Sequence, residues 1–246
     1  MENTNHKLAP SLHQLSTACL VFFLGFLLVA FFRTSFHSVD VSVNAWIPSI
    51  QTNSMTTIAK GIAVVFDTSI LAISSLAISG ILFLKNHKTL GLLLLGAIGG
   101  DALLVSLVKT MVHVARPTNA IFAYAGFSFP SGHSAACIVF GGLFAYFAWR
   151  HWQSLSYRVL IALGLSTVAG IVGFDRLYLG VHWVSDVIGG WLLGAFWLSF
   201  VVLLFRILHG TRKVESRRFC LVAWVLYFIA IVAVVFAICW ANLGPD

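Results

Sequence analysis

Long apolar blocks separated by short polar stretches dominate this chain. Each approaches the roughly 20 apolar residues that a membrane-spanning helix needs. Seven such blocks cover residues 15–32, 61–84, 90–108, 133–149, 159–175, 186–205 and 219–241. Their hydropathy does not alternate as in barrel strands, and backbone groups in hydrocarbon must be satisfied within the segment, so the pattern predicts helices. The fourth and fifth blocks are short, and we expect them to take in flanking residues.

Small residues recur inside these blocks, where they suit close packing between helices. They are Gly99–Gly100, Gly141–Gly142 and the pair Gly190 and Gly194. We therefore predict an all-α, polytopic transmembrane helical bundle that forms a single domain over residues 1–246. The prediction consists of a six-helix core and an additional seventh, C-terminal helix at about 219–241.

Residues 34–58 break the pattern, because Val, Trp46, Ile47 and Pro48 are mixed with Ser, Asn and Thr. This composition is compatible with an interfacial helix lying on the membrane surface. It is equally compatible with an ordinary loop, and the sequence leaves both interpretations open.

The composition also indicates that the protein lies in a lipid bilayer. The 246 residues are 59% hydrophobic and 9% charged, and the mean hydropathy is +0.95, whereas a soluble domain carries about 25% charged residues. We attribute the net charge of +7 to basic residues that set the membrane topology and contact anionic head groups, and not to nucleic-acid binding. No disulfide is expected, because all four cysteines lie inside apolar blocks, and no pair of them is spaced like a metal site. The first block is too long for a signal peptide and is interpreted as a retained helix.

Lys and Arg are distributed unequally between the two sides of the predicted bundle. With the N-terminus in the cytoplasm, 10 of the 15 basic residues fall on the cytoplasmic side and 5 on the other. Cytoplasmic loops are enriched in Lys and Arg, so we predict a cytoplasmic N-terminus and an extracytoplasmic C-terminus.

The loops predicted to lie outside carry the residues of chemical interest. Helix counting places the loop after the third block and the loop after the fifth on the same face. The charged residues and histidines that converge there are Lys109, Arg116, His133, Arg176, His182 and Asp186.

These residue types suit a phosphate group. The three cations can bind its oxygens, and the amides of Ser131 and Gly132 precede a helix whose N-terminus attracts anions. Two histidines supply a nucleophile and a proton donor. His182 and Asp186 are spaced i, i+4, so the carboxylate can fix the tautomer of the imidazole. With three cations present, a metal ion is not required to stabilise the transition state.

The spacing resembles the three motifs of the type 2 phosphatidic acid phosphatase superfamily, over about a third of the chain (109–186). The motifs read Lys109-x6-Arg116-Pro117, Pro130-Ser131-Gly132-His133 and Arg176-x5-His182-x3-Asp186. The resemblance implies that His182 is the nucleophile and forms a phosphohistidine, that Asp186 is its partner and that His133 protonates the leaving oxygen. It also implies that phosphate is bound by Lys109, Arg116, Ser131, Gly132 and Arg176.

Three acidic residues need a separate interpretation. The superfamily usually has Ser where this chain has Asp175; the carboxylate could repel phosphate, orient Arg176 through a salt bridge or point away. Asp67 and Asp101 lie inside apolar blocks, where carboxylates are costly. We interpret them as members of a structural polar network in preference to substrate ligands. His113, inside the first motif, is interpreted as a local loop residue.

The expected function is therefore a membrane lipid phosphatase without a cofactor or metal. Its substrate would be phosphatidic acid, phosphatidylglycerol phosphate or a polyprenyl diphosphate such as undecaprenyl diphosphate, and its site would face the extracytoplasmic side. Two alternatives stay open: a lipid phosphotransferase that uses the same histidine, and a phosphate-binding transporter that uses Asp67 and Asp101. The sequence does not indicate an oligomeric state.

Overall fold

The computed structural model describes residues 10–122, 124–151 and 154–209, in which helices are the regular structure and no strand occurs. Within this part of the chain, six helical segments are long and apolar enough to cross a membrane. They are Leu12–Phe31, Asn53–Leu84, Lys88–Val112, Gly132–Trp149, Leu155–Tyr178 and Val184–His209. The predicted all-α membrane bundle is confirmed, and the short fourth and fifth blocks do extend into flanking residues. The predicted seventh helix, 219–241, lies outside the described residues.

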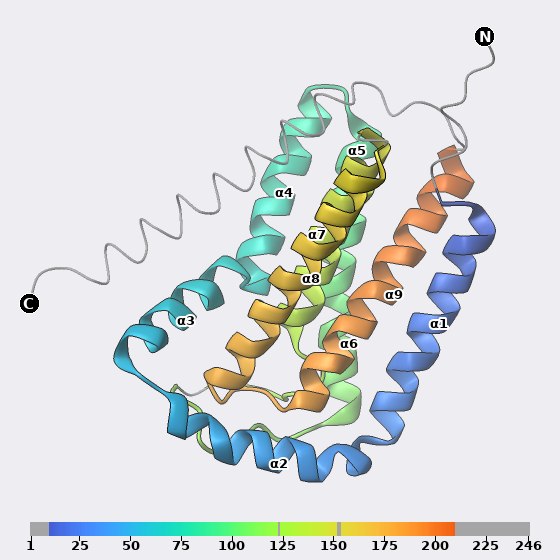
Figure 1. Cartoon of the computed structure of the whole chain (residues 1–246). Coiled ribbons are helices and arrows are strands. Elements are labelled where there is room, and N and C mark those ends of the chain that lie inside the picture. The colour runs from blue at the N-terminus through green and yellow to red at the C-terminus, as the bar shows by residue number, and fades with distance from the viewer. Residues whose placement is uncertain (1–9, 123, 152–153, 210–246) are drawn as a thin grey trace, which may run out of the picture.

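Figure 1 shows the bundle with one helix lying across its end. The helices are α1 (Leu12–Phe31), α2 (His37–Trp46), α3 (Asn53–Val65), α4 (Thr68–Leu84), α5 (Lys88–Leu94), α6 (Gly100–Val112), α7 (Gly132–His151), α8 (Leu155–Tyr178) and α9 (Val184–His209). Shorter segments are the 3-10 turns η2 (Arg33–Phe36) and η3 (Ile47–Ile50) and the π-helical segment η4 (Leu95–Gly99). Helix α9 packs along α1 on one side and along α7 on the other, and α7 also packs on α8.

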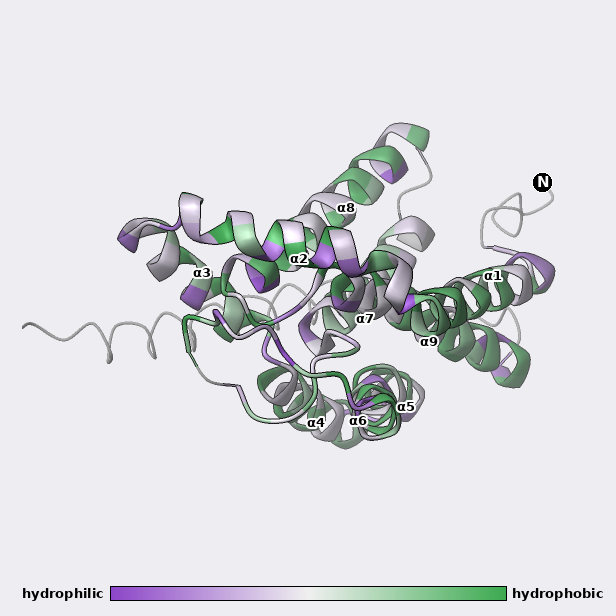
Figure 2. Ribbon diagram, turned by 90° about the horizontal axis from the view of Figure 1, so that it is seen from below, coloured by the Kyte–Doolittle hydropathy of each residue, from purple (hydrophilic) through white to green (hydrophobic). Residues whose placement is uncertain are grey.

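The segment 34–58 contains α2, so the structure supports the helical interpretation over the loop. Helix α2 runs across the end of the bundle and not along it, as an interfacial helix does (Figures 1 and 2). Its Asp40 is 6% exposed, although it is a carboxylate on a peripheral helix. This burial shows that one face of α2 is closely packed against the bundle.

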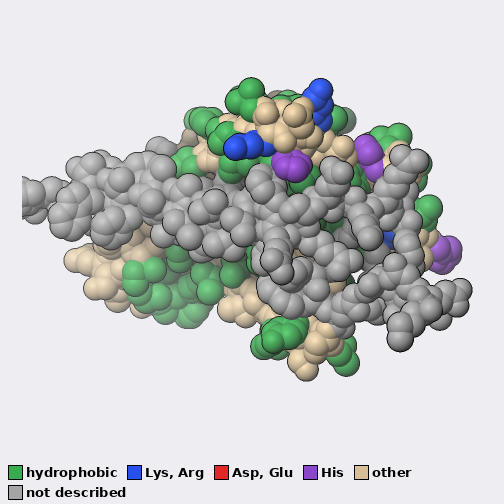
Figure 3. Space-filling model, turned by 90° about the horizontal axis from the view of Figure 1, so that it is seen from above, with side chains coloured by type: hydrophobic (Ala, Val, Ile, Leu, Met, Phe, Trp, Pro, Cys, Tyr) green, Lys and Arg blue, Asp and Glu red, His purple; other side chains and the backbone are tan. Residues whose placement is uncertain are grey.

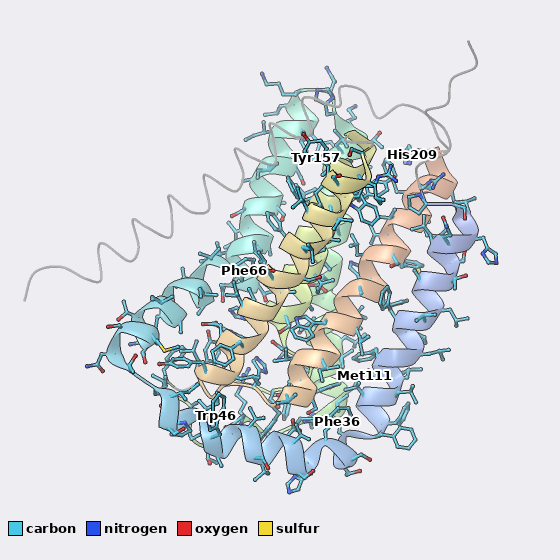
Figure 4. The ribbon with its side chains drawn as sticks, viewed as in Figure 1. Phe36, Trp46, Phe66, Met111, Tyr157 and His209 are labelled. Carbon is cyan, nitrogen blue, oxygen red and sulfur yellow. The ribbon has the colours of Figure 1, made fainter. Side chains whose placement is uncertain are left out.

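The second predicted span, 61–84, lies within the helical segment Asn53–Leu84, but the expectation of one continuous helix is wrong. Helix α3 ends at Val65 and α4 begins at Thr68, with Phe66 and Asp67 between them (Figure 4 labels Phe66). The break has a local cause, because Oδ1 of Asp67 accepts hydrogen bonds from the amides of Ser69 and Ile70. An Asp that caps a helix in this way is a strong start signal, even inside an apolar block.

The predicted glycine contacts are present where α9 crosses α7. A Cβ added to Gly190 would lie 2.5 Å from the carbonyl oxygen of Ser131, and one on Gly194 would lie 2.6 Å from that of Ala135. The two backbones approach each other closely only because these positions lack side chains. A Cβ added to Gly100, Gly141 or Gly142 would also meet a bulky side chain. One added to Gly99 would meet nothing within 4 Å among the described residues.

Both predicted loops of interest lie at the end of the bundle that carries α2. Figure 4 shows Met111, near the end of α6, at the same end as Phe36 and Trp46, whereas Tyr157 and His209 lie at the opposite end. Helices α6 and α8 end there, and α7 and α9 begin there. The number of helices between them predicts that the two motif-bearing loops lie on one face, and the structure agrees.

Candidate active site

A buried pair, His182 and Asp186, lies at the start of α9. Nδ1 of His182 is 3.4 Å from Oδ2 of Asp186, which also accepts a hydrogen bond of 2.8 Å from the amide of Trp183. The two side chains are 5% and 0% exposed. Since His182 belongs to the turn before α9 and Asp186 to its first turn, the spacing of four residues brings them together as the sequence predicts.

The environment of His182 keeps its imidazole neutral. Burial lowers its pKa to about 4, against the opposing effect of the hydrogen bond and the charge of Asp186; the charges of Lys109 and Arg116 lower it further. A neutral imidazole whose Nδ1–H faces a carboxylate carries its lone pair on Nε2. Nε2 is therefore available as a nucleophile at neutral pH.

Arg116 lies on the other side of His182. Its Nη1 is 3.5 Å from Nε2 of His182 and donates a 2.8 Å hydrogen bond to the carbonyl of Val181. Its Nη2 donates to the carbonyl of Phe127 at 3.2 Å, and its Nε donates to that of Gly126 at 3.1 Å. Burial lowers the pKa of Arg116, but a guanidinium remains protonated in proteins. Arg116 therefore joins the two motif-bearing loops and presents a fixed charge beside Nε2.

Lys109 stands in the last turn of α6 and anchors the loop that follows. Its Nζ donates to the carbonyl oxygens of Phe127 and Ser128, at 2.6 and 3.3 Å. Its charge acts on both Arg116 and His182. The ammonium group therefore belongs to the same cationic cluster.

Asp175, the departure from the superfamily pattern, forms an ion pair with the next residue, Arg176. Nε of Arg176 donates to Oδ2 of Asp175 at 2.9 Å, and its Nη2 contacts the same oxygen. Of the three interpretations of Asp175, the structure shows the salt bridge. Nη1 of Arg176 is buried and has no hydrogen-bond partner among the described residues. A buried donor of this kind is costly unless it serves a ligand.

His133 is the second residue of α7 and faces the break between α3 and α4. Its Nε2 is 3.1 Å from the carbonyl oxygen of Ala63 and 3.9 Å from Oδ2 of Asp67. It lies within electrostatic range of Arg176 and His182. Asp67 therefore has a structural role as a helix cap, and it also borders the candidate site.

Ser131 and Gly132 are buried in the turn that leads into α7. The amide of Ser131 donates to the carbonyl oxygen of Asp186 at 3.0 Å, and its hydroxyl is 3.0 Å from that of Ser134. The turn is thus fixed directly to the start of α9. Gly132 is the first residue of α7, where the amides have no intrahelical acceptor.

Two residues of this region were not identified from the sequence. In the sequence, Arg33 is only one of the five basic residues predicted on the extracytoplasmic side and Asp40 belongs to no motif, yet Arg33 contacts Asp186 and Asp40 contacts Ser185. Their partners lie 153 and 145 residues away in the chain, so no local spacing could reveal them. Among the described residues, no group of three or more His, Cys, Asp or Glu side chains could hold a metal ion.

The fold and the site define a polytopic membrane phosphatase. The family model of the PAP2 superfamily matches residues 90–209, and this chain belongs to that superfamily. Phosphatidylglycerophosphatase B of Bacillus subtilis is 33% identical over 178 residues, which are 70% of this chain and 87% of the relative. An undecaprenyl-diphosphatase of Sulfolobus acidocaldarius is 34% identical over 90 residues, 37% of this chain and 39% of the relative.

A solved structure has the same fold. The crystal structure of a transmembrane PAP2 type phosphatidylglycerolphosphate phosphatase from Bacillus subtilis matches with a TM-score of 0.66 and 30% sequence identity. The match covers 79% of this chain and 98% of the other. The resemblance inferred from three motifs therefore extends over most of the bundle.

Proposed function

We propose that this protein is a lipid phosphatase that hydrolyses the phosphate monoester or diphosphate of a membrane lipid through a phosphohistidine. The observation that carries the proposal is the arrangement around His182. Its Nδ1 faces the buried Asp186 and its Nε2 lies 3.5 Å from the guanidinium of Arg116. A phosphate held by the cations would therefore meet the nucleophilic nitrogen.

In the proposed reaction, Nε2 of His182 attacks phosphorus and the bond from phosphorus to the lipid oxygen breaks. His133 gives a proton to the leaving oxygen, and water then attacks the phosphohistidine with the neutral His133 as base. The N–P bond breaks, and inorganic phosphate and the free histidine result. Because Nε2 of His133 lies 3.1 Å from the Ala63 carbonyl, its side chain must shift to reach the leaving oxygen; catalytic contacts often tighten only when substrate binds.

The proposed phosphate site is cationic. Lys109, Arg116 and Arg176 would stabilise the charge that develops on the phosphoryl oxygens, which is the main task in phosphoryl transfer. The unpartnered Nη1 of Arg176 is a donor available for an oxygen. Ser131 would act by fixing the turn to α9, since its amide already bonds Asp186, and Gly132 would present its amide at the start of α7.

The position of the site favours a lipid substrate. The site lies at one end of a bundle whose outer faces expose large hydrophobic residues to the bilayer, so a lipid can keep its tail in hydrocarbon while its phosphate reaches the cations. The named relatives act on phosphatidylglycerophosphate and undecaprenyl diphosphate. We propose these two classes, together with phosphatidic acid, as substrates.

We further propose that the site faces away from the cytoplasm and that the N-terminus is cytoplasmic. The support is the sequence count, in which 10 of the 15 basic residues fall on the side predicted to be cytoplasmic. Figure 3 views that opposite end, where Lys, Arg and His side chains are visible. A reporter fused to the C-terminus, expected outside the cytoplasm, tests this orientation.

The activity test measures phosphate release from a panel of lipid phosphates by the purified protein, with and without EDTA. We expect activity that resists EDTA, is inhibited by vanadate and is lost in His182→Ala. The matched control is His113→Asn. His113 has a φ of 55°, which Asn tolerates, and this variant should retain activity. Strong dependence on a metal ion, or transfer of phosphate to an added alcohol in preference to water, would contradict the proposal.

A further inference from the structure

We infer that Arg33 and Asp40, which flank the start of α2, are positioning residues that hold Asp186 and the first turn of α9 in place for His182. The inference rests on the proposed function, in which Asp186 orients the attacking histidine. It assigns the interfacial helix α2 a role in the site that lies beneath it.

Arg33 contacts the oxygen of Asp186 that His182 does not use. Its Nη2 lies 3.3 Å from Oδ1 of Asp186, whereas Oδ2 faces Nδ1 of His182. The same Nη2 donates to the hydroxyl of Ser185 at 3.1 Å. The Arg33 side chain is 17% exposed and Asp186 is fully buried, so the pair is shielded from water and a charge-assisted bond there is stronger than at a surface.

Asp40 completes the network from α2. Its Oδ1 accepts a 2.9 Å hydrogen bond from the amide of Ser185, and its Oδ2 accepts one of 2.8 Å from the Ser185 hydroxyl. Ser185 is the second residue of α9, where amides lack an intrahelical acceptor. Asp40 therefore caps α9 from another helix, and the hydroxyl of Ser185 connects it to Arg33.

The side from which Arg33 approaches Asp186 indicates that Arg33 positions the carboxylate and does not bind substrate. Arg33 approaches the carboxylate on the side of Oδ1, whereas the proposed phosphate site lies at Nε2 of His182 beside Arg116. Arg33 also lies over the ring of Phe129, at 4.9 Å, in the loop that leads into α7. One guanidinium thus holds Asp186 and borders the loop before His133. It can affect catalysis through their placement without touching the phosphate.

The first experiment is a kinetic double-mutant cycle on the full-length protein in detergent, with Arg33→Met and Asp186→Asn. Arg33→Met should lower kcat roughly tenfold or more, the scale on which outer-shell partners of metal-bound histidines act. KM should stay within about twofold, because Arg33 makes no contact with substrate. In the Asp186→Asn background the same change should cost less than about twofold, since the residue through which it acts is altered. Arg33→Lys, which keeps the positive charge but loses the planar guanidinium, should recover part of kcat.

Lys60→Met is the matched control, because it removes an exposed cation from α3, a helix that begins at the same end of the bundle. It should leave kcat and KM unchanged. Equal losses from Arg33→Met in both backgrounds, a raised KM with unchanged kcat, or a lower folded yield with normal kcat per folded molecule would each overturn the inference.

The second experiment does not depend on activity. Amide hydrogen exchange of the segment 182–187 should be faster in Arg33→Met and in Asp40→Ala than in the wild type or Lys60→Met, because the amides of Trp183 and Ser185 are held by Asp186 and Asp40. Unchanged exchange overturns the inference. If the wild type released phosphate from no lipid, the proposed function would fail, whereas the exchange result would still decide whether α2 holds the start of α9.

Discussion

Nη1 of Arg116 lies 3.5 Å from Nε2 of His182, the ring nitrogen that faces away from Asp186. The same guanidinium donates hydrogen bonds to the carbonyl oxygens of Val181 and Phe127. Arg116 therefore fixes the backbone on both sides of the site and supplies charge where phosphate would react. A compact ammonium group cannot do both, because it lacks the planar arrangement of donors.

We expect Arg116→Lys to lower kcat/KM by about 100-fold, the scale on which one electrostatic donor to a transition state acts. The loss should appear in lipid phosphate hydrolysis and also as weaker vanadate inhibition. The control is Arg158→Lys, in α8 at the opposite end of the bundle, which should leave both unchanged. Normal activity of Arg116→Lys would show that charge alone suffices at this position.

The pH dependence of kcat/KM should show His182 titrating far below the usual range of histidine. Burial lowers its pKa to about 4, and only the neutral ring attacks phosphorus. Activity should therefore persist as pH falls through about 6.5, and the protonation of His182 should abolish it only near pH 4. Rates are measured between about pH 3.5 and 8. They are corrected for the ionisation of the substrate, which phosphorus NMR measures in the same micelles.

Asp186→Asn tests whether the loss of activity at acidic pH comes from the protonation of His182. The carboxylate raises the pKa of His182 against burial, so its loss should move the acidic limb to still lower pH. The rate should also fall by about 10⁴-fold, as when an amide replaces the carboxylate of a catalytic triad and the wrong tautomer results. An acidic limb near pH 6.5 that this substitution does not move would exclude His182 as its source.

Asp175→Ser should show how the ion pair with Arg176 affects protein stability and how it affects anion binding. Loss of a buried partner leaves an uncompensated charge, and we expect stability to fall by about 3–5 kcal/mol. In the folded fraction, the freed guanidinium should bind anions more tightly, so vanadate should inhibit at lower concentration. Thermal unfolding in detergent and vanadate inhibition measure the two effects. If both stayed at wild-type values, Asp175 would not restrain Arg176.

Six spans and the relative placement of the motifs were predictable because lipid imposes strong constraints. A spanning helix must be long and apolar, and counting helices fixes which loops share a side. The break at Phe66 was missed because the apolar block continues through it, although Asp67 followed by Thr and Ser is a helix-start signal. That signal divides the block at the position where α3 ends and α4 begins.

The contacts of Arg33 and Asp40 could not be predicted in the same way. Each depends on how α2 packs across the end of the bundle, and a single sequence carries no periodicity that sets this packing. The ion pair of Asp175 with Arg176 was one of three interpretations left open, since neighbouring side chains can point together or apart. Only side-chain geometry distinguishes these cases.

Asp101 is buried in α6 just after the π-helical segment, and its Oδ1 has no hydrogen-bond partner among the described residues. We interpret it as a structural residue without a role in chemistry. Asp101→Asn keeps the shape of the side chain and cannot ionise, so activity and thermal stability should both be retained. Loss of turnover with normal expression and melting would show that Asp101 takes part in the reaction or in transport of a charged species.

The crossing of α7 and α9 should be sensitive to a single methyl group. A Cβ on Gly194 would lie 2.6 Å from the carbonyl oxygen of Ala135 and 3.0 Å from its Cα, and backbone atoms cannot move aside as a side chain can. We expect Gly194→Ala to lower stability by about 1–3 kcal/mol, as overpacking does. It should also lower kcat, because these helices carry His133 and Asp186 at their starts.

Gly170→Ala in α8 is the matched control: among the described residues its Cβ meets nothing within 4 Å, and Ala favours a helix. Its melting temperature should therefore equal or exceed that of the wild type, and equal melting of the two variants would contradict close packing at this crossing.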